Sequence, residues 1–492
     1  MKKQILLALD IGTSSTRAVA YDAHTAEAIP GAVYAIDHQP EATPDGGSTL
    51  SPDALVSEVI RCLGETLDRA GSSCEPLGVG MSCFWHSFVG VDEAGEPHTP
   101  VLVWADRRSA PQVTRLRHTI DVAAYTDTTG CQLHTSYALG RLLWLQETQP
   151  DIWRRCHRFL SPAEYIFSRL FGLERTTCSL CMASGTGLCQ EKAGIWDLPT
   201  LALVPGLTVD HLSPIHDAPV RGIRSPYRER LPRLADLPWF PGLGDGACSN
   251  IGCGATRPGT IALMIGTSGA LRAVVPAAPA VAPGLWRYLI DSDRWLVGGA
   301  LSNGGAVWAW LRATLNLPGL SDNALDNALG ALTPDAHRLT VLPFLYGERA
   351  PLWRDDATAV IVGLQGSTTP LDIARAHMEA VAYRFAAVRD ALRTVVPSGR
   401  VLGTGAALVK SAAWGQILAD VLQEEIDVAA ETQASARGAA LWVREKLGLG
   451  AIEMAAPLPV IAQMQPDLPT RDIYTAARTR HEALLSMLIP DL

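Results

Sequence analysis

The sequence has no apolar run long enough to cross a membrane. A membrane-spanning helix needs about 18 or more consecutive apolar residues, and no stretch of the 492 residues reaches that length. The opening residues MKKQILLALD resemble the start of a signal peptide, but Asp10 ends the apolar run and no small-residue cleavage site follows. We therefore expect neither a membrane span nor a secretion signal.

Basic clusters are also missing. Lys and Arg total 41 against 50 Asp and Glu, which gives a net charge of −9. No Lys/Arg run reaches the density typical of a nucleic-acid or polybasic membrane surface. The composition, 48% hydrophobic, instead predicts a soluble acidic enzyme with no nucleic-acid or membrane partner. A chain of this length exceeds one hydrophobic core and predicts two domains or more.

Paired cysteine motifs are scarce. The ten cysteines are scattered along the chain, which predicts a reducing compartment and so a cytoplasmic protein. Cys178 and Cys181 form one CxxC, but no second pair follows at the spacing of a zinc ribbon. We favour ordinary half-buried thiols for this pair, and a metal or redox role stays open.

The chain does contain one motif twice. LALDIGTSSTRAVAYD occupies Leu7–Asp22 and IALMIGTSGALRAVV occupies Ile261–Val275, and both share IGTS followed by RAV. Each copy predicts a strand, a Gly-Thr-Ser turn and a second strand-like run, because Gly permits a tight turn. Backbone N–H groups that converge in such a turn suit an oxyanion. Two such turns, half a chain apart, predict duplicated domains that grip one polyphosphate, whereas a single turn would be read as a plain hairpin.

The two copies differ at one informative position. Asp10 precedes the first turn, whereas Met264 occupies the matching position in the second. A carboxylate on one side only is what a single phosphate-bound Mg²⁺ needs, since Mg²⁺ prefers one or two carboxylates plus phosphate oxygens and water. We therefore predict that Asp10 holds Mg²⁺ directly or through water.

An aspartate between two glycines, Asp245, lies just before the second turn. In such a context Asp is often only a turn former. Here it follows an irregular Pro- and Arg-rich stretch, residues 213–242, which predicts the approach to a hinge, and substrate clefts tend to lie near hinges. Phosphoryl transfer to an alcohol benefits from a carboxylate that orients the hydroxyl and accepts its proton. Asp245 is our candidate for that base.

Aromatic and polar residues gather in two segments of the first half, FWHS at 84–87 and VWADRRS at 103–109. Aromatic rings beside two-point polar groups suit a polyol. Arg107 and Arg108 could clamp a carboxylate through planar hydrogen bonds, although a solvated loop is the alternative, and which of the two would make the contact stays open.

Two further segments carry less specific signals. The turn at 403–407, GTGAA, has small side chains that let a flat adenine ring approach the backbone, but a plain strand-to-helix turn reads the same way. The GERAP segment at 347–351 follows an apolar strand, and its residues alone assign it no role.

Apolar periodicity predicts an α/β fold. Helical spacing covers 52–70, 136–146, 304–315 and 371–396, and strand-like runs cover 77–84 and 86–92. The segment 400–410 predicts a strand, a glycine-rich turn and a helix. Strands that alternate with helices indicate layers of helices on mixed sheets.

Together these motifs resemble those of the FGGY carbohydrate kinases, in the actin-like ATPase superfamily. DIGTSSTRA, GDG, IGTSGALRA, the NGG at 303–305, PFLYGERAP and GTGAAL occur in the family's order over nearly the whole chain. The resemblance implies two ribonuclease-H-like domains around a deep cleft. Residues 1–243 would bind the sugar and carry the first phosphate loop, and residues 244–492 would bind ATP and begin with the catalytic Asp.

The resemblance also implies roles for single residues, with ATP and Mg²⁺ as the cofactors. Asp245 matches the catalytic base and Asp10 the magnesium-linked carboxylate. The nucleotide-binding positions are Gly12, Thr13, Ser14, Ser15, Arg17, Gly266, Thr267, Gly305, Gly405 and Ala406. The sugar-binding positions are Trp85, His86, Trp104, Asp106, Arg107 and Asp245.

Within the family the sequence looks most like the gluconate kinases, through WADRRS, TGCQLHTS, IGTSGALR and GERAPLW. It departs from them at Trp85, where they carry Met, and at Arg107 or Arg108, where Asn is frequent. We predict ATP-dependent phosphorylation of D-gluconate to 6-phosphogluconate. The alternatives are a xylulose kinase or another pentulose or polyol kinase and, from another class, an actin-like ATPase that regulates a partner. A homodimer is compatible with the family but unsupported by any pattern.

Overall fold

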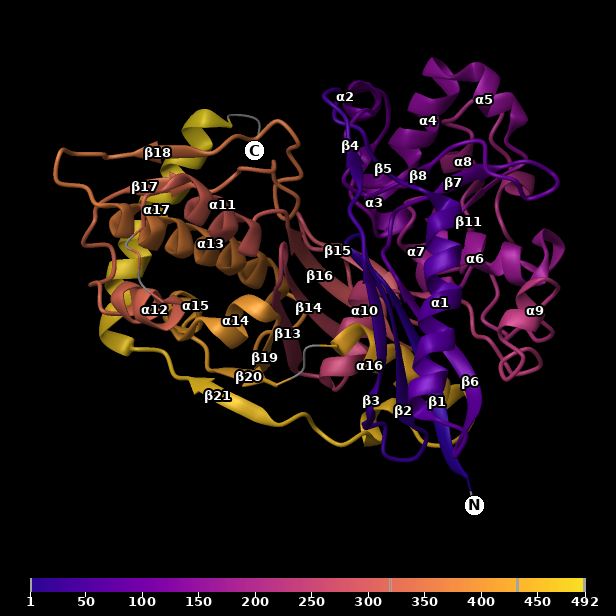
Figure 1. Ribbon diagram of the computed structural model, residues 1–492. Helices are drawn as coiled ribbons and strands as arrows, with labels where there is room; N and C mark the ends of the chain where they lie inside the picture. Colours follow the sequence, from indigo (N-terminus) through magenta and orange to yellow (C-terminus); the bar gives the residue numbers. More distant parts are fainter. Residues whose placement is uncertain (1, 318, 320, 431–432, 490–492) are drawn as a thin grey trace.

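The computed structural model describes residues 2–317, 319, 321–430 and 433–489, and the outermost residues of the two predicted domain ranges lie outside them. Figure 1 shows two α/β halves side by side, with the N-terminal half in indigo and magenta and the C-terminal half in orange and yellow. The predicted α/β architecture is confirmed. No helix in the described part of the chain is long and apolar enough to span a membrane.

The first half contains a five-stranded sheet with the order β12-β6-β1-β2-β3. Strands β1, β2 and β3 form consecutive antiparallel hairpins, whereas β6 and β12 lie parallel to β1 and to each other. The three hairpin strands are β1 (Lys3–Ile11), β2 (Ser15–Asp22) and β3 (Ala28–Asp37), and the parallel pair is β6 (Cys74–Cys83) and β12 (Leu243–Gly244). Strand β12 straddles the predicted division between residues 243 and 244, and that division stays a proposal.

The second sheet repeats this plan inside a seven-stranded sheet with the order β15-β16-β14-β13-β19-β20-β21. Three central strands are antiparallel and two are parallel, as in the first sheet. The strands are β13 (Thr260–Ile265), β14 (Gly269–Val275), β15 (Trp286–Leu289), β16 (Trp295–Leu301), β19 (Arg400–Thr404), β20 (Ile426–Ala429) and β21 (Val460–Met464). The duplication read from the motifs is therefore a duplication of whole ribonuclease-H-like sheets.

The register of the two leading hairpins differs in a way that the motifs hide. In the first hairpin Arg17 lies opposite Asp10. In the second hairpin Ala270 lies opposite Met264, and Arg272 lies opposite Ala262, two residues deeper in the strand. The arginines of the shared RAV sequence therefore lie at different distances from their turns along the strand.

The predicted helices are present to within a few residues, as α1 (Pro52–Ala70), α4 (Ala138–Thr148), α11 (Gly305–Thr314) and α13 (Pro370–Leu392). Helix α1 begins where predicted because the Ser51 side chain caps the Ala54 N–H and Pro52 occupies the first turn. In the predicted irregular stretch, residues 213–242, the structure has one short helix, α9 (Tyr227–Arg230).

Smaller elements fill the remaining space around the two sheets. The other helices are α2 (Ala110–Thr119), α3 (Val122–Thr129), α5 (Pro150–Arg155), α6 (Pro162–Phe171), α7 (Leu180–Ser184), α8 (Leu198–Leu201), α12 (Asp322–Gly330), α14 (Ala406–Lys410), α15 (Ala412–Leu422) and α17 (Arg471–Leu488). The short strands are β4 (Glu41–Ala42), β5 (Ser48–Leu50), β7 (Val89–Val91), β8 (Val101–Leu102), β9 (Arg158–Leu160), β10 (Cys189–Gln190), β11 (Ile195–Trp196), β17 (Thr340–Leu342) and β18 (Val360–Val362).

Two helices, α10 (Asp245–Cys253) and α16 (Ala434–Lys446), lie between the sheets and join the halves (Figure 1). Their backbones touch because glycines face each other: a Cβ on Gly438 would lie 1.9 Å from the Cys248 carbonyl oxygen. Helix α16 also packs on the first sheet, where a Cβ on Gly80 would lie 2.6 Å from the Ala439 carbonyl oxygen. A helix from the far end of the chain thus covers the N-terminal sheet.

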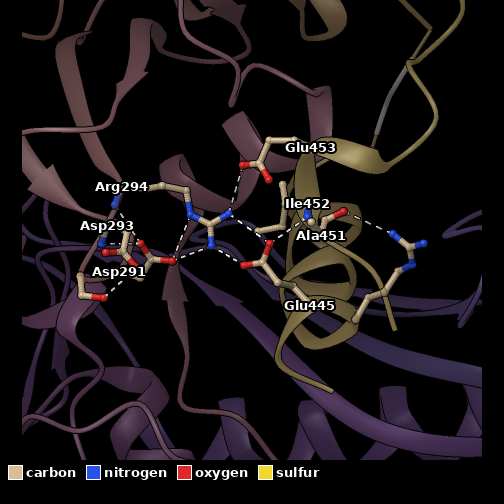
Figure 2. A network of polar contacts seen from close by, with 9 residues as sticks. Asp291, Asp293, Arg294, Glu445, Ala451, Ile452 and Glu453 are labelled. Atoms are coloured by element: carbon tan, nitrogen blue, oxygen red, sulfur yellow. Dashed lines mark hydrogen bonds and ion pairs between the residues drawn. The ribbon is translucent and has the colours of Figure 1, made fainter. Parts of the chain in front are cut away.

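An ionic network fastens α16 to the second sheet (Figure 2). Arg294, in the turn between β15 and β16, lies between three carboxylates that belong to Asp291, Glu445 and Glu453. The Arg294 residue donates to Asp291 Oδ2 at 3.0 Å from Nε and to Glu453 Oε1 at 3.2 Å from Nη1. Glu445 also accepts from the Ile452 N–H at 2.8 Å. Because the Arg294 side chain is only 14% exposed, the network is partly shielded from water and holds the end of α16 in place.

Candidate active site

The two predicted phosphate turns are both tight hairpin turns at the centre of their sheets. The Gly12 N–H donates to the Ser15 carbonyl at 2.9 Å, and the Gly266 N–H donates to the Ser268 carbonyl at 2.9 Å. Thr13 and Ser15 are partly exposed and Ser14 is exposed, so the hydroxyls of this turn are accessible. Such turns leave N–H and O–H groups that suit an anion, and phosphate binding at both turns stays a prediction.

A network of partly buried side-chain hydrogen bonds supports the first turn. His38 lies with Nε2 3.0 Å from the Gly12 carbonyl oxygen and Nδ1 2.9 Å from Glu58 Oε2. The Thr16 hydroxyl donates to the same Glu58 oxygen at 2.7 Å. Because the Gly12 carbonyl can only accept, His38 holds a proton on Nε2. The turn is thereby tied to α1, and none of these partners was found by motif.

The second turn is joined to the start of α11. The Gly305 N–H donates to the Gly266 carbonyl at 2.8 Å, and the Ala306 N–H donates to the Thr267 carbonyl at 2.9 Å. A Cβ on Gly305 would lie 2.5 Å from the Gly266 carbonyl oxygen, so only glycine allows this approach. The predicted NGG helix entry and the predicted IGTS turn are therefore one structure.

A cavity of about 650 Å³ opens beside this second turn. Of the predicted nucleotide residues, Gly266, Thr267, Gly305 and Ala406 line it. Its other walls are mostly apolar, with two cationic and two acidic side chains, and were not predicted: they include Trp308, Arg312, Asp322, Asp326, Tyr346, Met378, Lys410 and Trp414. A volume of this size and an apolar lining with few polar groups suit a nucleoside.

A smaller cavity of about 250 Å³ lies next to the first, and Ala406 lines both. It contains Asp10, Asp245 and Gly405, so the structure brings the predicted magnesium residue and the predicted base together. Gly405 has φ 97°, and a Cβ there would lie 2.4 Å from the Ile265 carbonyl oxygen, which explains the glycine. The larger cavity could hold a nucleoside, and the smaller cavity beside it contains the carboxyl groups of Asp10 and Asp245.

Burial raises the pKa of both carboxyl groups in the smaller cavity. Burial raises the pKa of Asp10 to about 6, against a hydrogen bond of 3.1 Å from the Ser82 hydroxyl. Burial also raises the pKa of Asp245, and the guanidinium of Arg272 opposes that rise. Asp245 begins α10, and its Oδ1 accepts from the Gly246 N–H at 2.7 Å. A carboxylate that has lost part of its hydration is a better proton acceptor.

The donor set of this cavity fits Mg²⁺. Asp10 offers a carboxylate in a polar hollow, Asp245 lies close enough to raise its pKa, and the first turn stands at its side. One or two carboxylates near phosphate oxygens are what Mg²⁺ takes. Asp10 as its ligand stays a prediction. Arg17 lies opposite Asp10 in the hairpin, and its charge opposes the rise of the Asp10 pKa.

On the sugar side, His86 is held in an unusual backbone conformation. Its φ is 63°, and its Nδ1 lies 2.5 Å from the Gly185 carbonyl oxygen. Burial lowers the pKa of His86 to about 3, so the ring is neutral at pH 7. With the proton on Nδ1, Nε2 is left as a hydrogen-bond acceptor. Such an acceptor suits a sugar hydroxyl, as predicted for this position.

Trp85 is buried beside the residue that precedes Asp245. Its side chain is 5% exposed, and its indole N–H donates to the Cys181 carbonyl at 3.2 Å. A Cβ on Gly244 would lie 1.8 Å from the indole ring, so the ring packs directly against that glycine. The indole therefore supports the Asp245 turn, and the substrate contact of Trp85 stays a prediction.

Asp106 is also buried. Its side chain is 1% exposed, and its carboxylate accepts from Arg108 Nη2 at 2.6 Å and from the Ser48 N–H at 3.1 Å. Arg108 in turn lies 4.3 Å above the Trp144 ring. Both partners are therefore engaged in the fold. The contacts of Asp106 hold the loop in shape, and its sugar contact stays a prediction.

Arg107 remains the accessible member of the arginine pair. It is exposed, and its Nη1 lies 3.5 Å from the Asp355 carbonyl oxygen in the other half. Trp104 is half-buried, and the Arg349 guanidinium lies 4.6 Å above its ring. The sugar side therefore presents two guanidinium groups, from Arg107 and Arg349, beside aromatic rings.

Two arginines of the site were missed from the sequence. Arg349 belongs to the GERAP segment, to which no role was assigned. Arg272 lines the smaller cavity, and its signal was the second RAV of the duplication. Strand register, which a motif does not reveal, brings Arg272 to Asp245 instead of to the second turn.

The CxxC pair is structural. Both thiols are buried in the main hydrophobic cluster, and burial raises the pKa of Cys178 and of Cys181. The Gly244 N–H donates to Cys181 Sγ at 3.4 Å, so this thiol supports the strand before Asp245. The free thiols of the described chain number ten, and all are buried.

Comparison with known proteins identifies the family. The model for the N-terminal domain of the FGGY family of carbohydrate kinases matches residues 5–252, and the model for its C-terminal domain matches residues 261–443. A gluconokinase of Bacillus licheniformis is 29% identical over 93% of this chain and 90% of its own length. A xylulose kinase of Streptomyces rubiginosus is 30% identical over 89% and 86%. The crystal structure of a gluconate kinase from Lactobacillus acidophilus shares the fold, with a TM-score of 0.90 and 24% identity over 99% and 98% of the two chains.

Proposed function

Because this chain belongs to the FGGY family of carbohydrate kinases, we propose that it phosphorylates the terminal hydroxyl of D-gluconate with ATP. The observation that carries the sugar assignment is the pair of guanidinium groups at the sugar side. Arg349 lies over Trp104 with its Nε unpartnered among the described residues, and Arg107 is exposed at the mouth. A planar guanidinium binds a carboxylate through two parallel hydrogen bonds, which a neutral sugar cannot accept as strongly.

In the proposed reaction, the side chains of the smaller cavity act on the acceptor hydroxyl. Asp245 orients the hydroxyl and takes its proton as the new P–O bond forms. The N–H groups of the two turns and Arg17 bind the phosphate oxygens. Mg²⁺ held at Asp10 supplies charge neutralisation on those oxygens when it is bound. Closure of the halves excludes water and so limits ATP hydrolysis.

A neutral ketose is the second candidate. It is favoured by the S. rubiginosus xylulose kinase, which matches this chain at 30% identity. Its acceptor chemistry at Asp245 would be unchanged, but Arg107 and Arg349 would then have no carboxylate to bind. A partner-regulating ATPase of the same fold would need no sugar pocket, so the His86, Trp104 and Arg349 cluster argues against it.

The cellular setting follows from the thiols. Ten buried free thiols support a reducing compartment, for which the cytoplasm is our proposal. A homodimer stays open, because no surface of the described residues singles out a self-complementary face.

The test is ADP release from MgATP in a coupled assay with gluconate, xylulose, ribulose, glycerol and no sugar. Strong stimulation by gluconate alone is expected. Stimulation by xylulose instead would retain Asp245 and overturn the acidic sugar. ADP release that needs no sugar would favour the partner-regulating ATPase.

A further inference from the structure

Arg272 occupies a position that two glycines clear for it. It projects from β14, opposite Ala262 and Gly298. A Cβ on Gly298 would lie 2.9 Å from Arg272 Cγ, and a Cβ on Gly246 would lie 2.3 Å from Arg272 Nη1. The stem therefore needs Gly298, and the guanidinium abuts the residue that follows Asp245. The fold provides space for this side chain at the floor of the smaller cavity.

The Arg272 guanidinium is buried, and two of its three nitrogens lack a partner among the described residues. Arg272 is 5% exposed, and its Nε and Nη2 have no hydrogen-bond partner in the described part of the chain. The carboxylate of Asp245 is the main negative charge that acts on it, but no hydrogen bond joins the two among the described residues. A buried cation with unsatisfied donors is costly unless an anion arrives to accept them. The donors lie in a cavity that also contains Asp10, Thr404 and Gly405.

We propose that Arg272 is a catalytic residue that binds the phosphoryl group during its transfer from ATP to the sugar. The position of Arg272 in the smaller cavity favours the phosphoryl group over the sugar carboxylate as its ligand. Arg272 shares its space with the carboxylate pair and the turn at Gly405, on the nucleotide side, whereas Arg349 stands over Trp104 on the sugar side. The inference rests on the kinase reaction of the family and not on the identity of the sugar.

The step balances without another reactant. The hydroxyl oxygen of the sugar forms a bond to the γ-phosphorus, the bond from that phosphorus to the bridging oxygen of ADP breaks, and the hydroxyl proton passes to Asp245. Charge meanwhile spreads over the three equatorial oxygens of the transferring group. Donors that strengthen their bonds to those oxygens in the transition state raise kcat with little change in substrate binding. Asp245 and Arg272 would thus act on the two sides of the forming bond.

The test compares Arg272→Gln and Arg272→Lys with Arg400→Gln, a control on strand β19 of the same sheet, where the arginine is 55% exposed. For Arg272→Gln we expect kcat to fall about 100-fold, with KM for sugar and ATP changed less than about threefold. For Arg272→Lys we expect a smaller loss, because one charge remains. Arg400→Gln is expected to keep wild-type kinetics.

Two readouts separate this role from a structural one. Guanidinium ion added to Arg272→Gln should restore part of kcat and should do nothing for wild type. The complex of MgADP, aluminium fluoride and sugar, which imitates the transferring group, should weaken about 100-fold in Arg272→Gln while ADP alone binds as before. Unchanged kcat, or a raised KM for sugar with normal binding of the imitator, would overturn the proposal. Because kcat is measured with whichever sugar the enzyme prefers, a wrong sugar assignment would leave this result readable.

Discussion

At the scale of single residues, Asp245 is the proposed base. It begins α10 in the cavity that also holds Asp10, and burial raises its pKa. We predict that Asp245→Asn lowers kcat by at least about 1,000-fold, because the amide cannot accept the hydroxyl proton. ATP binding, measured by calorimetry, should be unchanged. Near wild-type turnover in Asp245→Asn would refute its assignment as the base.

A substitution of Arg107 tests whether the substrate is an acidic sugar. It is exposed at the mouth, whereas Arg108 is paired with Asp106. We predict that Arg107→Ala raises KM for gluconate about tenfold and KM for a neutral sugar by much less, since only gluconate offers a carboxylate. Arg115→Ala, which loses another exposed ion pair on α2, is the control. Equal effects of Arg107→Ala on both sugars would remove the carboxylate argument.

The raised pKa of Asp10 predicts that the free energy of unfolding depends on pH. Burial raises its pKa from 3.8 to about 6 in the folded chain, so folding favours the protonated form. The stability that this form contributes is complete below pH 3.8 and is lost as pH rises through about 6. Asp10→Asn does not ionise and should therefore gain up to about 3 kcal/mol over wild type above pH 6, without Mg²⁺ or ATP. Urea unfolding between pH 4 and pH 8 measures this difference.

A constant difference between Asp10→Asn and wild type over that pH range would contradict the assigned shift. The same variant is expected to lose activity, because it cannot supply the carboxylate that Mg²⁺ needs.

Motifs predicted which carboxylates and turns the structure brings together, but they could not predict the side-chain partners that hold other candidate residues. Asp10, Asp245 and the glycines of the turns could be read from their neighbours in sequence. Asp106 and Trp85 could not, because their partners, Ser48 and Cys181, lie 58 and 96 positions away. Arg349 stands over Trp104, a contact between the two halves of the chain that no local pattern contains.

At the scale of elements, pattern was most informative where an element has its own periodicity and caps. Helix α1 was predicted at its observed bounds because Ser51, Pro52 and a buried apolar stripe all belong to one segment. The two leading hairpins were predicted as equivalent, but a difference in register separates Arg17 from Arg272. Register depends on the number of residues in the turn, and a repeat that is read by similarity conceals it.

The contact between α10 and α16 tests how the Asp245 helix is held. A Cβ on Gly438 would lie 1.9 Å from the Cys248 carbonyl oxygen. We predict that Gly438→Ala lowers the free energy of unfolding by about 1–3 kcal/mol and reduces kcat, because α10 must shift. Gly64→Ala is the control: this helix position in α1 has open space around the added Cβ and should gain about 1 kcal/mol.

Urea unfolding and steady-state kinetics on the two glycine variants measure these effects. Wild-type stability in Gly438→Ala would show that the helices can separate without cost, and would detach the position of Asp245 from α16.

At the scale of the whole molecule, the halves also meet across the mouth of the cleft. Asp355 of the second half accepts from the Thr135 hydroxyl at 2.8 Å and lies 3.0 Å from His134 Nε2. The Tyr137 and Tyr288 hydroxyls lie 2.5 Å apart nearby. These contacts join the two halves through residues that are 151 to 221 positions apart in sequence, which is why the motifs alone could not reveal them.

Loss of the Asp355 contacts should loosen closure. We predict that Asp355→Ala raises the KM for sugar several-fold and increases the ADP formed per sugar phosphate, because water gains access to the phosphates. Asp356→Ala, at a neighbouring exposed carboxylate that pairs with Arg354 two residues away, is the control. The ratio of ADP to sugar phosphate measures the effect, and a ratio of one in Asp355→Ala would show that closure does not depend on this contact.

The measurement that tests the central claim most directly is kcat/KM for D-gluconate against D-glucitol, its six-carbon analogue with a hydroxymethyl group in place of the carboxylate. The pair isolates the charge that Arg107 and Arg349 are proposed to bind. We predict a preference for gluconate of about 10- to 100-fold, as expected for charge-assisted hydrogen bonds. Equal values, or a preference for glucitol or a neutral ketose, would contradict an acidic sugar as the substrate.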